Sequence, residues 1–373
     1  MVVEEGTEQA QSDPLAERLM RLSAATGVSG HEGEVARLIA GEMQAWADEV
    51  RTDRLGNCIA LRRGQPPAGV RAPRLMLAAH MDEIGMVVSR IDKGGFLRVS
   101  PMGGVNVQTL MGQSVTVHAA GGPVPGVVGL KPPHLTTPEE RKEFPRWEDL
   151  FVDCGLNEEE ARSRIQVGDI VSVDARPVTL LGDRVAGKAL DNRASVAVLM
   201  EAMQRLSALR HAADVLAVAT VQEEVGLRGA EVSAFGLEPD LAVAVDVTFA
   251  RQRMVGEPDV TELGKGPAIA WGANMHPRIV ERLHQTARLH GVPFQVEVVP
   301  GRSGTDAWAI QVARAGIPTA LVSVPLRYMH TPVEVVDLRD IRETGRLLAH
   351  FAAGLDAGLL GALSDWGVAT VGR

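Results

Sequence analysis

The sequence predicts an α/β fold in which a mostly parallel central sheet, flanked by helices, is interrupted by a small all-β, barrel-like inserted domain. The first observation is that continuous apolar runs of strand length alternate with amphipathic helical segments, which is the pattern of a parallel sheet covered by helices. The second is that this pattern stops between residues 86 and 187, where short alternating runs are separated by Gly and Pro. Together they predict an α/β domain of residues 1–85 and 188–373, with a β-rich domain of residues 86–187 inserted into it.

The N-terminal part of the chain is predicted to be mainly helical. Residues 14–49 have a helical pattern with one break, and Ser29 or Gly30 is expected to cap the helix that follows the break. The acidic and polar residues 1–13 are expected to form a disordered tail. A buried strand with the sequence RLMLAAH is predicted at residues 74–80.

The inserted segment is predicted to consist of short strands. Residues 113–119 and 169–175 alternate between apolar and polar side chains and are bounded by turn residues. One short helix is predicted within the segment at Asn157–Ile165, with Asn157 as its N-cap.

The remainder of the chain returns to alternating helices and strands. Several of its apolar runs, such as DVLAVATV, are continuous, as in strands that are buried on both faces. In chain order we expect a helix at 192–209, a strand at 214–221, a helix from residue 228, a strand at 240–246, a helix at 276–291, a strand at 294–299, a helix near 306–316, a strand at 317–325 and a last helix from residue 338.

The composition argues against several classes of protein. The net charge is −9, whereas nucleic-acid-binding proteins usually carry a basic face. No apolar run approaches the roughly 20 residues that span a bilayer, and the N-terminus lacks the basic and apolar regions of a signal peptide. The two cysteines, Cys58 and Cys154, do not make a disulfide framework. We therefore expect a cytoplasmic protein whose partners include neither nucleic acid nor a membrane.

Acidic and histidine side chains follow the predicted strands at the points where the strands end. Functional residues of open α/β sheets collect at the carboxyl ends of the strands, so these side chains are expected to lie close together. One further aspartate stands where the chain re-enters the α/β domain, directly before a helix. The residues are His80, Asp82, Asp191, Glu223, Glu224, Asp246 and His330.

This mixture of imidazole and carboxylate groups suits a divalent metal such as zinc, cobalt or manganese. The carboxylates outnumber the needs of one ion, which favours two ions joined by a bridging carboxylate. Such a pair polarises a carbonyl group and lowers the pKa of a water molecule. Because Glu223 and Glu224 are adjacent, they point in different directions, so we expect one to bind metal and the other to act as general base.

Each of these residues also has a simpler explanation. Taken alone, His80 would be a core histidine and Asp191 an ordinary helix N-cap. Asp246 is harder to explain, because it is flanked by valines and a buried charge is costly unless it is paired. Asp306 either approaches the site or serves the N-terminus of a helix. The coincidence of so many such residues at strand ends favours a metal site.

The motifs resemble those of the M42 family of metallo-aminopeptidases. The segments are AAHMDEIGMVVSRI, KPPHL, GKALDNRAS, QEEVGLRGA, AVAVDV and SGTDAWAIQVARAGIPTALVSVPLRYMHTPVE, and the resemblance covers about residues 15–355. It implies a zinc-exopeptidase-like fold in which the β-rich segment is the family's inserted domain. It also implies a homo-oligomer, commonly a dodecamer.

The resemblance further implies a role for each candidate residue. His80 and Asp246 would bind one metal, Glu224 and His330 the other, and Asp191 would bridge the two. Glu223 would act as general base, and Asp82 would orient His80. Asn192 departs from the family, because many members carry a second aspartate there. This change removes a charge near the metals without removing a ligand.

The expected function is therefore metal-dependent removal of N-terminal amino acids from peptides with a free N-terminus. An M20-type amidohydrolase, deacylase or carboxypeptidase that uses the same metal site is the first alternative. An endoglucanase is a second, although a glycosidase needs two carboxylates and no metal. A non-catalytic metal-binding scaffold is a third, and it predicts that Glu223→Gln leaves function intact. The sequence does not predict which N-terminal side chain is preferred.

Overall fold

The computed structural model describes residues 13–139, 142–253 and 260–364. Twelve of the thirteen residues of the predicted tail, 1–12, lie outside this range. Asp13 does not belong to a tail, because it is the N-cap of helix α1 (Pro14–Ala24) and its carboxylate accepts a hydrogen bond of 3.0 Å from the backbone N–H of Leu15.

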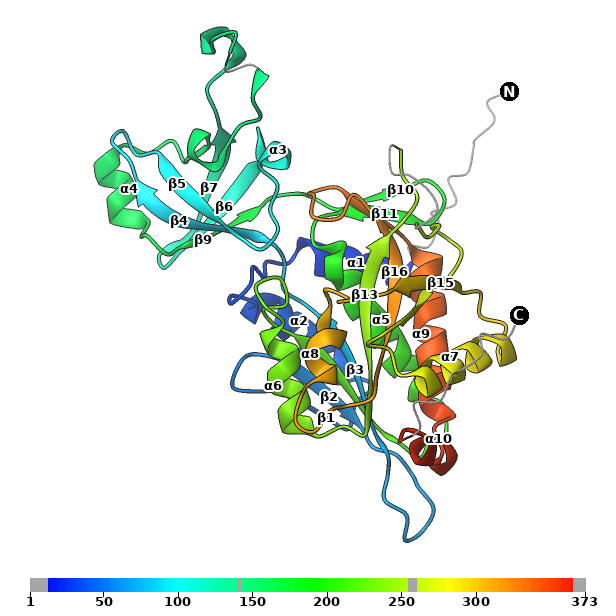
Figure 1. Cartoon of the computed structure of the whole chain (residues 1–373). Helices are drawn as coiled ribbons and strands as arrows, with labels where there is room; N and C mark the ends of the chain where they lie inside the picture. Colours follow the sequence, from blue (N-terminus) through cyan, green and yellow to red (C-terminus); the bar gives the residue numbers. More distant parts are fainter. Residues whose placement is uncertain (1–12, 140–141, 254–259, 365–373) are drawn as a thin grey trace, which may run out of the picture.

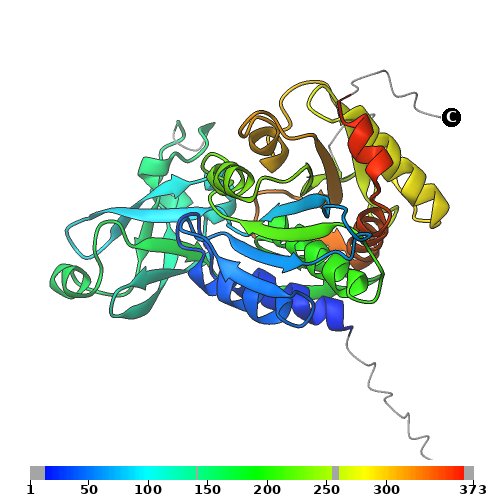
Figure 2. The same cartoon turned by 90° about the horizontal axis from the view of Figure 1, so that it is seen from below.

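Two bodies make up the described part of the chain, an α/β domain built on a large sheet and a closed β-barrel beside it (Figures 1 and 2). The main path of the sheet runs β1-β2-β12-β3-β13-β16-β17-β11-β10, and β14 and β15 join it alongside β16. The strands are β1 (Glu49–Thr52), β2 (Cys58–Arg62), β3 (Arg74–His80), β10 (Val178–Leu180), β11 (Arg184–Gly187), β12 (Asp214–Thr220), β13 (Leu241–Phe249), β14 (Ala268–Gly272), β15 (Gln295–Val299), β16 (Thr319–Arg327) and β17 (Glu334–Asp337).

The four central strands of the sheet, β12, β3, β13 and β16, run parallel to one another. They are buried along almost their whole length, which explains their continuous apolar sequences. On either side of this centre the pairing is mixed, because β2, β14 and β17 are antiparallel to the central strands that they join. The predicted parallel sheet is thus the centre of a mixed sheet.

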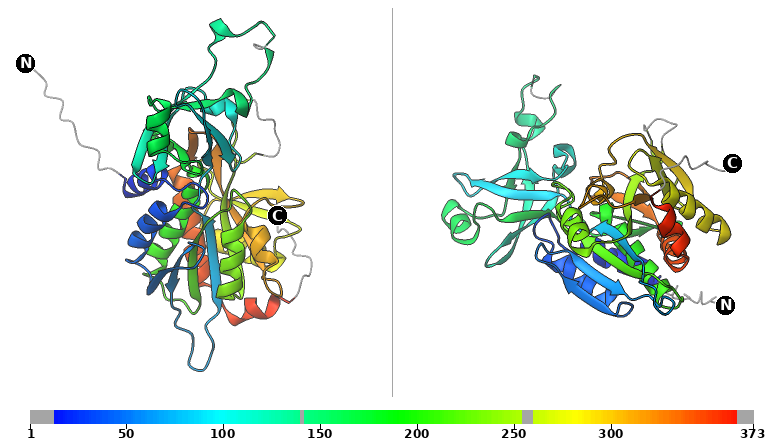
Figure 3. Two further views of the ribbon diagram at one scale, coloured as in Figure 1. Left: turned by 90° about the vertical axis from the view of Figure 1, so that its left-hand side faces the viewer. Right: turned by 60° about the horizontal axis from the view of Figure 1, so that its bottom comes forward.

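Helices cover both faces of this sheet (Figure 3). Helix α5 packs on β3 and β13 and is itself covered by α9 and α1, while α6 and α8 pack against the same central strands and against each other. The helices of the α/β domain besides α1 are α2 (Gly33–Met43), α5 (Leu190–Leu206), α6 (Arg228–Leu237), α7 (Pro277–Leu289), α8 (Asp306–Gln311), α9 (Leu338–Ala353) and α10 (Ala357–Ala362).

Two details of the N-terminal prediction are wrong. The helical pattern was extended to residue 49, but α2 ends at Met43 and residue 49 begins β1, which pairs with β2 at the edge of the sheet. The predicted caps are not used either. The N-cap of α2 is Glu32, and the hydroxyl of Ser29 instead donates a hydrogen bond of 2.7 Å to Asp82.

The inserted segment forms a closed barrel with the strand order β4-β5-β8-β7-β6-β9. Its interior is filled mainly by small aliphatic side chains such as Val115, Val117 and Val152. The predicted helix is present as α4 (Glu158–Arg164), and Asn157 caps it in a reciprocal capping box with Glu160. The barrel strands are β4 (Gly85–Ile91), β5 (Leu97–Met102), β6 (Ser114–Ala119), β7 (Gly122–Gly129), β8 (Phe151–Asp153) and β9 (Ile170–Val173), and the segment also holds α3 (Val107–Leu110), η1 (Pro133–Leu135) and η3 (Trp147–Asp149).

The end of the barrel differs from the predicted boundary at residue 187. The last barrel strand ends at Val173, whereas the hairpin β10–β11 belongs to the large sheet, where β11 pairs with β17. The pairing satisfies backbone groups along β17 that would otherwise stay open at an edge. Composition predicts the inserted segment up to residue 187 but does not show which sheet a strand joins.

A fully buried arginine ties the start of α5 to the N-terminal helices. Arg193 is 0% exposed, and its guanidinium donates hydrogen bonds to the carbonyl oxygens of Met81, Leu22 and Ala25. Its Nη2 also lies 3.4 Å from Oε1 of Glu83, whose other oxygen is 2.6 Å from Nζ of Lys188. The network joins α1, α5 and the connection into the barrel. Among the described residues, no helix has both the length and the apolar character needed to cross a membrane.

We expect the substitution R193M to lower the free energy of unfolding by about 3–5 kcal/mol, because it removes the guanidinium donor from three buried carbonyl groups and leaves Glu83 with Lys188 alone as its cationic partner. The measurement is urea denaturation followed by circular dichroism, with R54M as a control at an exposed arginine. A loss of less than about 1 kcal/mol for R193M would show that the network does not hold these elements together.

Candidate metal centre

The predicted site residues converge at the carboxyl ends of the central parallel strands. His80 is the last residue of β3, and Glu223 and Glu224 follow the end of β12. Asp246 lies within β13, and His330 lies in the turn after β16. The remaining ones, Asp82 and Asp191, come from the segment after β3 and from the first turn of α5.

Asp191 lies between the two histidines. Its Oδ1 is 3.2 Å from Nε2 of His80, and its Oδ2 is 3.3 Å from Nε2 of His330. The φ and ψ angles of Asp191 are not helical, and its peptide bond to Asn192 is cis. The contacts with both imidazoles show that the carboxylate faces the site instead of serving as a simple helix cap.

The other carboxylates surround the same two imidazoles. Nε2 of His80 lies 3.9 Å from Oδ1 of Asp246 and 3.9 Å from Oε2 of Glu223. Nε2 of His330 lies 3.4 Å from Oε1 of Glu224. One ligand atom each from His80, Asp191 and Glu224 lie within 4.8 Å of one another, a grouping that could hold a metal ion.

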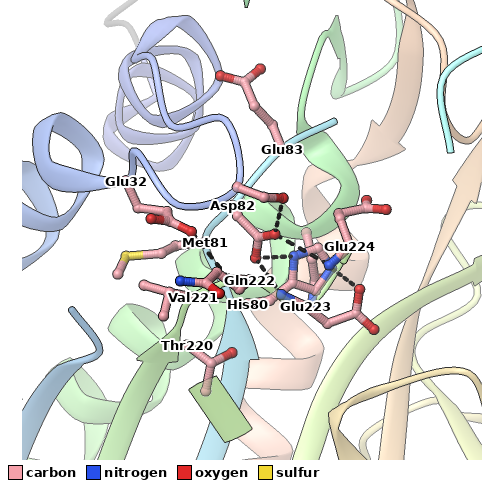
Figure 4. A network of polar contacts seen from close by, with 12 residues as sticks. Glu32, His80, Met81, Asp82, Glu83, Thr220, Val221, Gln222, Glu223 and Glu224 are labelled. Carbon is pink, nitrogen blue, oxygen red and sulfur yellow. Dashed lines mark hydrogen bonds and ion pairs between the residues drawn. The ribbon is translucent and has the colours of Figure 1, made fainter. Parts of the chain in front are cut away.

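Asp82 connects His80 to the turn that carries the two glutamates (Figure 4). Its Oδ1 is 3.5 Å from Nδ1 of His80. The backbone N–H groups of Glu223 and Glu224 donate hydrogen bonds to its two oxygens, at 3.0 and 3.2 Å, and Ser29 donates a third. Asp82 is fully buried, so one carboxylate sets both the direction of the imidazole and the position of the turn.

Glu334 was missed by the sequence analysis. Its Oε1 accepts a hydrogen bond of 2.8 Å from the backbone N–H of His330, and its Oε2 accepts one of 3.0 Å from that of Asp191. It is only 2% exposed. A signal was present, because Glu334 stands between two valines in the segment HTPVEVV, as Asp246 does in its own segment. The same argument about buried charge applies to both.

A glycine loop from the barrel closes one side of the site. A Cβ atom added to Gly104 would lie 2.5 Å from Nδ1 of His330, and one added to Gly103 would lie 3.2 Å from Cβ of Glu224. Gly103 also has a φ of +81°, which disfavours other residues. The barrel therefore approaches the site so closely that a larger residue at position 104 would displace His330.

Asn192 and Asp306 form hydrogen bonds with strands β13 and β12 beside the cluster. Nδ2 of Asn192 donates a hydrogen bond of 2.9 Å to the carbonyl oxygen of Val245, next to Asp246. Asp306 is 2% exposed and accepts a hydrogen bond of 2.6 Å from the hydroxyl of Thr220, at the end of β12. Asp306 thus lies close to the site, but it is not among the residues that line the cavity in front of it.

The electrostatics of the cluster favour the uptake of cations. Burial, together with the charges of Asp246, Asp306 and Glu224, raises the pKa of Glu223 to about 10. Burial also raises the pKa of Asp246 and of Glu224. Hydrogen bonds to Asp191 and Glu224 raise the pKa of His330 to about 11. The carboxyl groups thus shift mainly because they are buried, and His330 shifts because carboxylates surround its imidazole.

The donor set fits a divalent metal. It consists of imidazole nitrogens and carboxylate oxygens, the ligands that zinc and similar ions prefer. The cluster opens onto a cavity of about 490 Å³, which His80, Asp191, Glu223, Glu224, Asp246 and His330 help to line. A substrate in this cavity can reach the cluster directly.

Comparison with known proteins assigns the chain to a family. The sequence model of the M42 glutamyl aminopeptidase family matches residues 56–347. A lysyl aminopeptidase of Pyrococcus furiosus is 40% identical over 336 residues, which cover 89% of this chain and 94% of the relative. The structure of an aminopeptidase from the archaeon Desulfurococcus kamchatkensis has a TM-score of 0.86 at 37% identity and covers 94% of this chain and 97% of its own. The structure of the Pyrococcus horikoshii TET1 peptidase has a TM-score of 0.80 at 31% identity and covers 91% of this chain and 100% of its own. That peptidase is described as assembling into a tetrahedron or a large octahedral shell.

The fold, the cluster and these similarities define a peptide hydrolase of the aminopeptidase class. The chain belongs to the M42 family of aminopeptidases, as its motifs indicated.

We expect the substitution E334Q to weaken metal binding by about 10–100-fold, because an amide accepts through one oxygen and so loses one of the two backbone hydrogen bonds that position Asp191 and His330. The measurement is competition with a chromophoric chelator, and the control is E343Q on α9. Equal metal affinity in E334Q and wild type would contradict a positioning role for Glu334.

Proposed function

We propose that this protein removes N-terminal residues from peptides with the help of two divalent metal ions, zinc first and cobalt or manganese as alternatives. The observation that carries the proposal is the placement of Asp191, whose two carboxylate oxygens face two different histidines. A carboxylate in this position is suited to join two ions, one beside each imidazole.

The contacts support a division of the remaining ligands into two sets. Asp246 is near His80, and Glu224 is near His330, so each set pairs one imidazole with one carboxylate. When bound, the two ions polarise the scissile carbonyl group and make a water molecule more acidic. Asp82 holds His80 in the orientation that presents Nε2 to the cluster.

Glu223 is suited to the transfer of protons. It lines the cavity beside His80, and its neighbour Glu224 is directed to His330. The charge of the two bound cations would lower the raised pKa of Glu223. In the proposed reaction its ionised carboxylate would take a proton from the attacking water and give it to the nitrogen of the departing amine. The two adjacent glutamates thus have separate tasks.

The charges of the cavity favour a substrate with a free amine. Several carboxylates line one wall, and they attract the ammonium group of a peptide N-terminus. A carboxypeptidase needs a cationic clamp for the terminal carboxylate. Of the described lining residues, Arg302 alone is a lysine or arginine, and it lies outside the metal cluster. The amidohydrolase, endoglucanase and scaffold alternatives are not favoured by the family assignment.

We also propose a homo-oligomer, with a dodecamer as the expected form. Assembly of the Pyrococcus horikoshii relative into a tetrahedron or a large octahedral shell supports a homo-oligomer. The barrel segment between β7 and η3 holds exposed apolar side chains, among them Leu135 and Phe144 at 68% and 78% exposure. Figure 1 shows part of this segment projecting from the barrel. Exposed apolar groups of this kind are common at protein interfaces. Both cysteines are free, which suits a reducing cytoplasm.

The names of the relatives do not determine which N-terminal residue is removed. The family description refers to glutamyl substrates and the Pyrococcus furiosus relative to lysyl substrates, and these carry opposite charges. The preference therefore has to come from this chain's own cavity.

The aminopeptidase activity is tested with aminoacyl-p-nitroanilides and their N-acetylated controls, using protein that has been stripped by a chelator and then reloaded with zinc, cobalt or manganese. We expect cleavage of the free-amine substrates alone, lost after stripping and restored by metal. Cleavage of the acetylated substrates would support a deacylase instead, and activity that resists the chelator would contradict a metal-dependent reaction.

We expect the substitution E223Q to lower kcat by about 10²–10⁴-fold and to leave the metal content at the wild-type value. The substitution removes the general base but keeps every proposed metal ligand. Kinetics and metal analysis of the same preparation check this. E224Q should instead lose metal, and E231Q, on the exposed face of α6, is the control. Wild-type kcat in E223Q would exclude it as the base.

A further inference from the structure

The cavity extends well beyond the metal cluster. Its far part lies between the ends of β13, β15 and β16 and the loop of residues 302–305. Apart from the cluster, the charged residues among its described lining residues are Glu297 and Arg302. These two have opposite signs, so their positions decide which substrate side chain the far part accepts.

Glu297 presents its carboxylate in the interior of this region. The hydroxyl of Thr248 donates a hydrogen bond of 2.5 Å to its Oε1. Its Oε2 is shielded from water and has no hydrogen-bond partner among the described residues. Burial raises the pKa of Glu297, and the hydroxyls of Thr248 and Ser323 act against that shift. Glu297 is among the residues that line the cavity, and no lysine, arginine or histidine pairs with its carboxylate among the described residues. A largely buried carboxylate without a cationic partner is a recognition group for a cation.

The position of Glu297 relative to the metal cluster suits a long side chain. Thr248 follows Asp246 by two residues on β13, so both project from the same face of the sheet. Two residues of a strand span about 6.6 Å. Glu297, which is bonded to Thr248, therefore stands roughly one such step from the cluster where the N-terminal amine is held.

Part of the cavity wall is apolar. Leu227, Leu321, Met329 and Val299 line the cavity. Such a wall accommodates the methylene groups of a lysine or arginine, whose charged end then reaches beyond it.

Arg302 does not compete for this position. Its guanidinium lies over the ring of Trp308, 5.6 Å from the ring centroid. Trp308 is not among the lining residues, and Arg302 itself is exposed. The positive charge is thus held at the rim, directed away from the interior.

We propose that Glu297 is the specificity-determining residue of this enzyme and that it selects peptides whose N-terminal residue has a cationic side chain, lysine or arginine. The ammonium or guanidinium group would pair with the carboxylate of Glu297, while the stem lies along the apolar part of the wall. This inference rests on the proposed aminopeptidase function and names its substrate class.

The test compares kcat/KM for the p-nitroanilides of lysine, arginine, norleucine, leucine and glutamate in the metal-loaded enzyme. We expect lysine to exceed norleucine, which has a stem of similar length without the charge, by about 30-fold or more. E297Q should lower kcat/KM for lysine and arginine by a similar factor and leave norleucine and leucine within about threefold. R302Q, the matched variant at the rim, should keep the wild-type ratio of lysine to norleucine.

Three results would overturn the proposal. They are equal rates for lysine and norleucine in wild type, an equal loss for all substrates in E297Q, and a preference for glutamate that disappears in R302Q. If no substrate is cleaved, the proposed function has failed instead. Calorimetric titration with free L-lysine and L-norleucine then still tests the pocket, since tighter binding of lysine that E297Q abolishes supports it and equal binding refutes it.

Discussion

Repulsion among buried carboxylates is the constraint on which the rest of this structure depends. Asp82, Asp191, Glu223, Glu224 and Asp246 gather around two imidazoles at the end of the central parallel strands. Charges so placed are costly in a protein interior unless cations neutralise them. Two divalent ions would do so. The same carboxylates and imidazoles line a cavity, so ions that they bound would be in reach of a peptide substrate.

The fold holds these groups through its backbone. Asp82 accepts hydrogen bonds from the backbone N–H groups of Glu223 and Glu224, and Glu334 accepts them from those of Asp191 and His330. These bonds join segments up to 143 residues apart in the chain. The barrel contributes as well, because the backbone at Gly104 lies against His330. The inserted domain is thus part of the site's wall as well as a separate body.

Much of the candidate site could be predicted because parallel strands end at one edge of their sheet. That rule alone brought His80, Asp246 and the two glutamates together from distant parts of the sequence. The contacts around them could not be predicted in the same way. Periodicity shows which face a strand buries, but it does not show which distant backbone N–H group a carboxylate will meet. The sequence therefore predicts a helix-capping role for Ser29, whose hydroxyl instead bonds to Asp82, and it does not predict the contacts of Glu334. The boundary predicted at residue 187 differs for a related reason, since composition does not identify the sheet that β10 and β11 join.

Anomalous diffraction from crystals of metal-loaded protein, recorded at the absorption edge of the metal, is the most direct measurement of the cluster's purpose. Two peaks flanking the carboxylate of Asp191, one beside His80 and one beside His330, are the predicted result. A single peak, or density remote from Asp191, would contradict a dinuclear centre bridged by that residue.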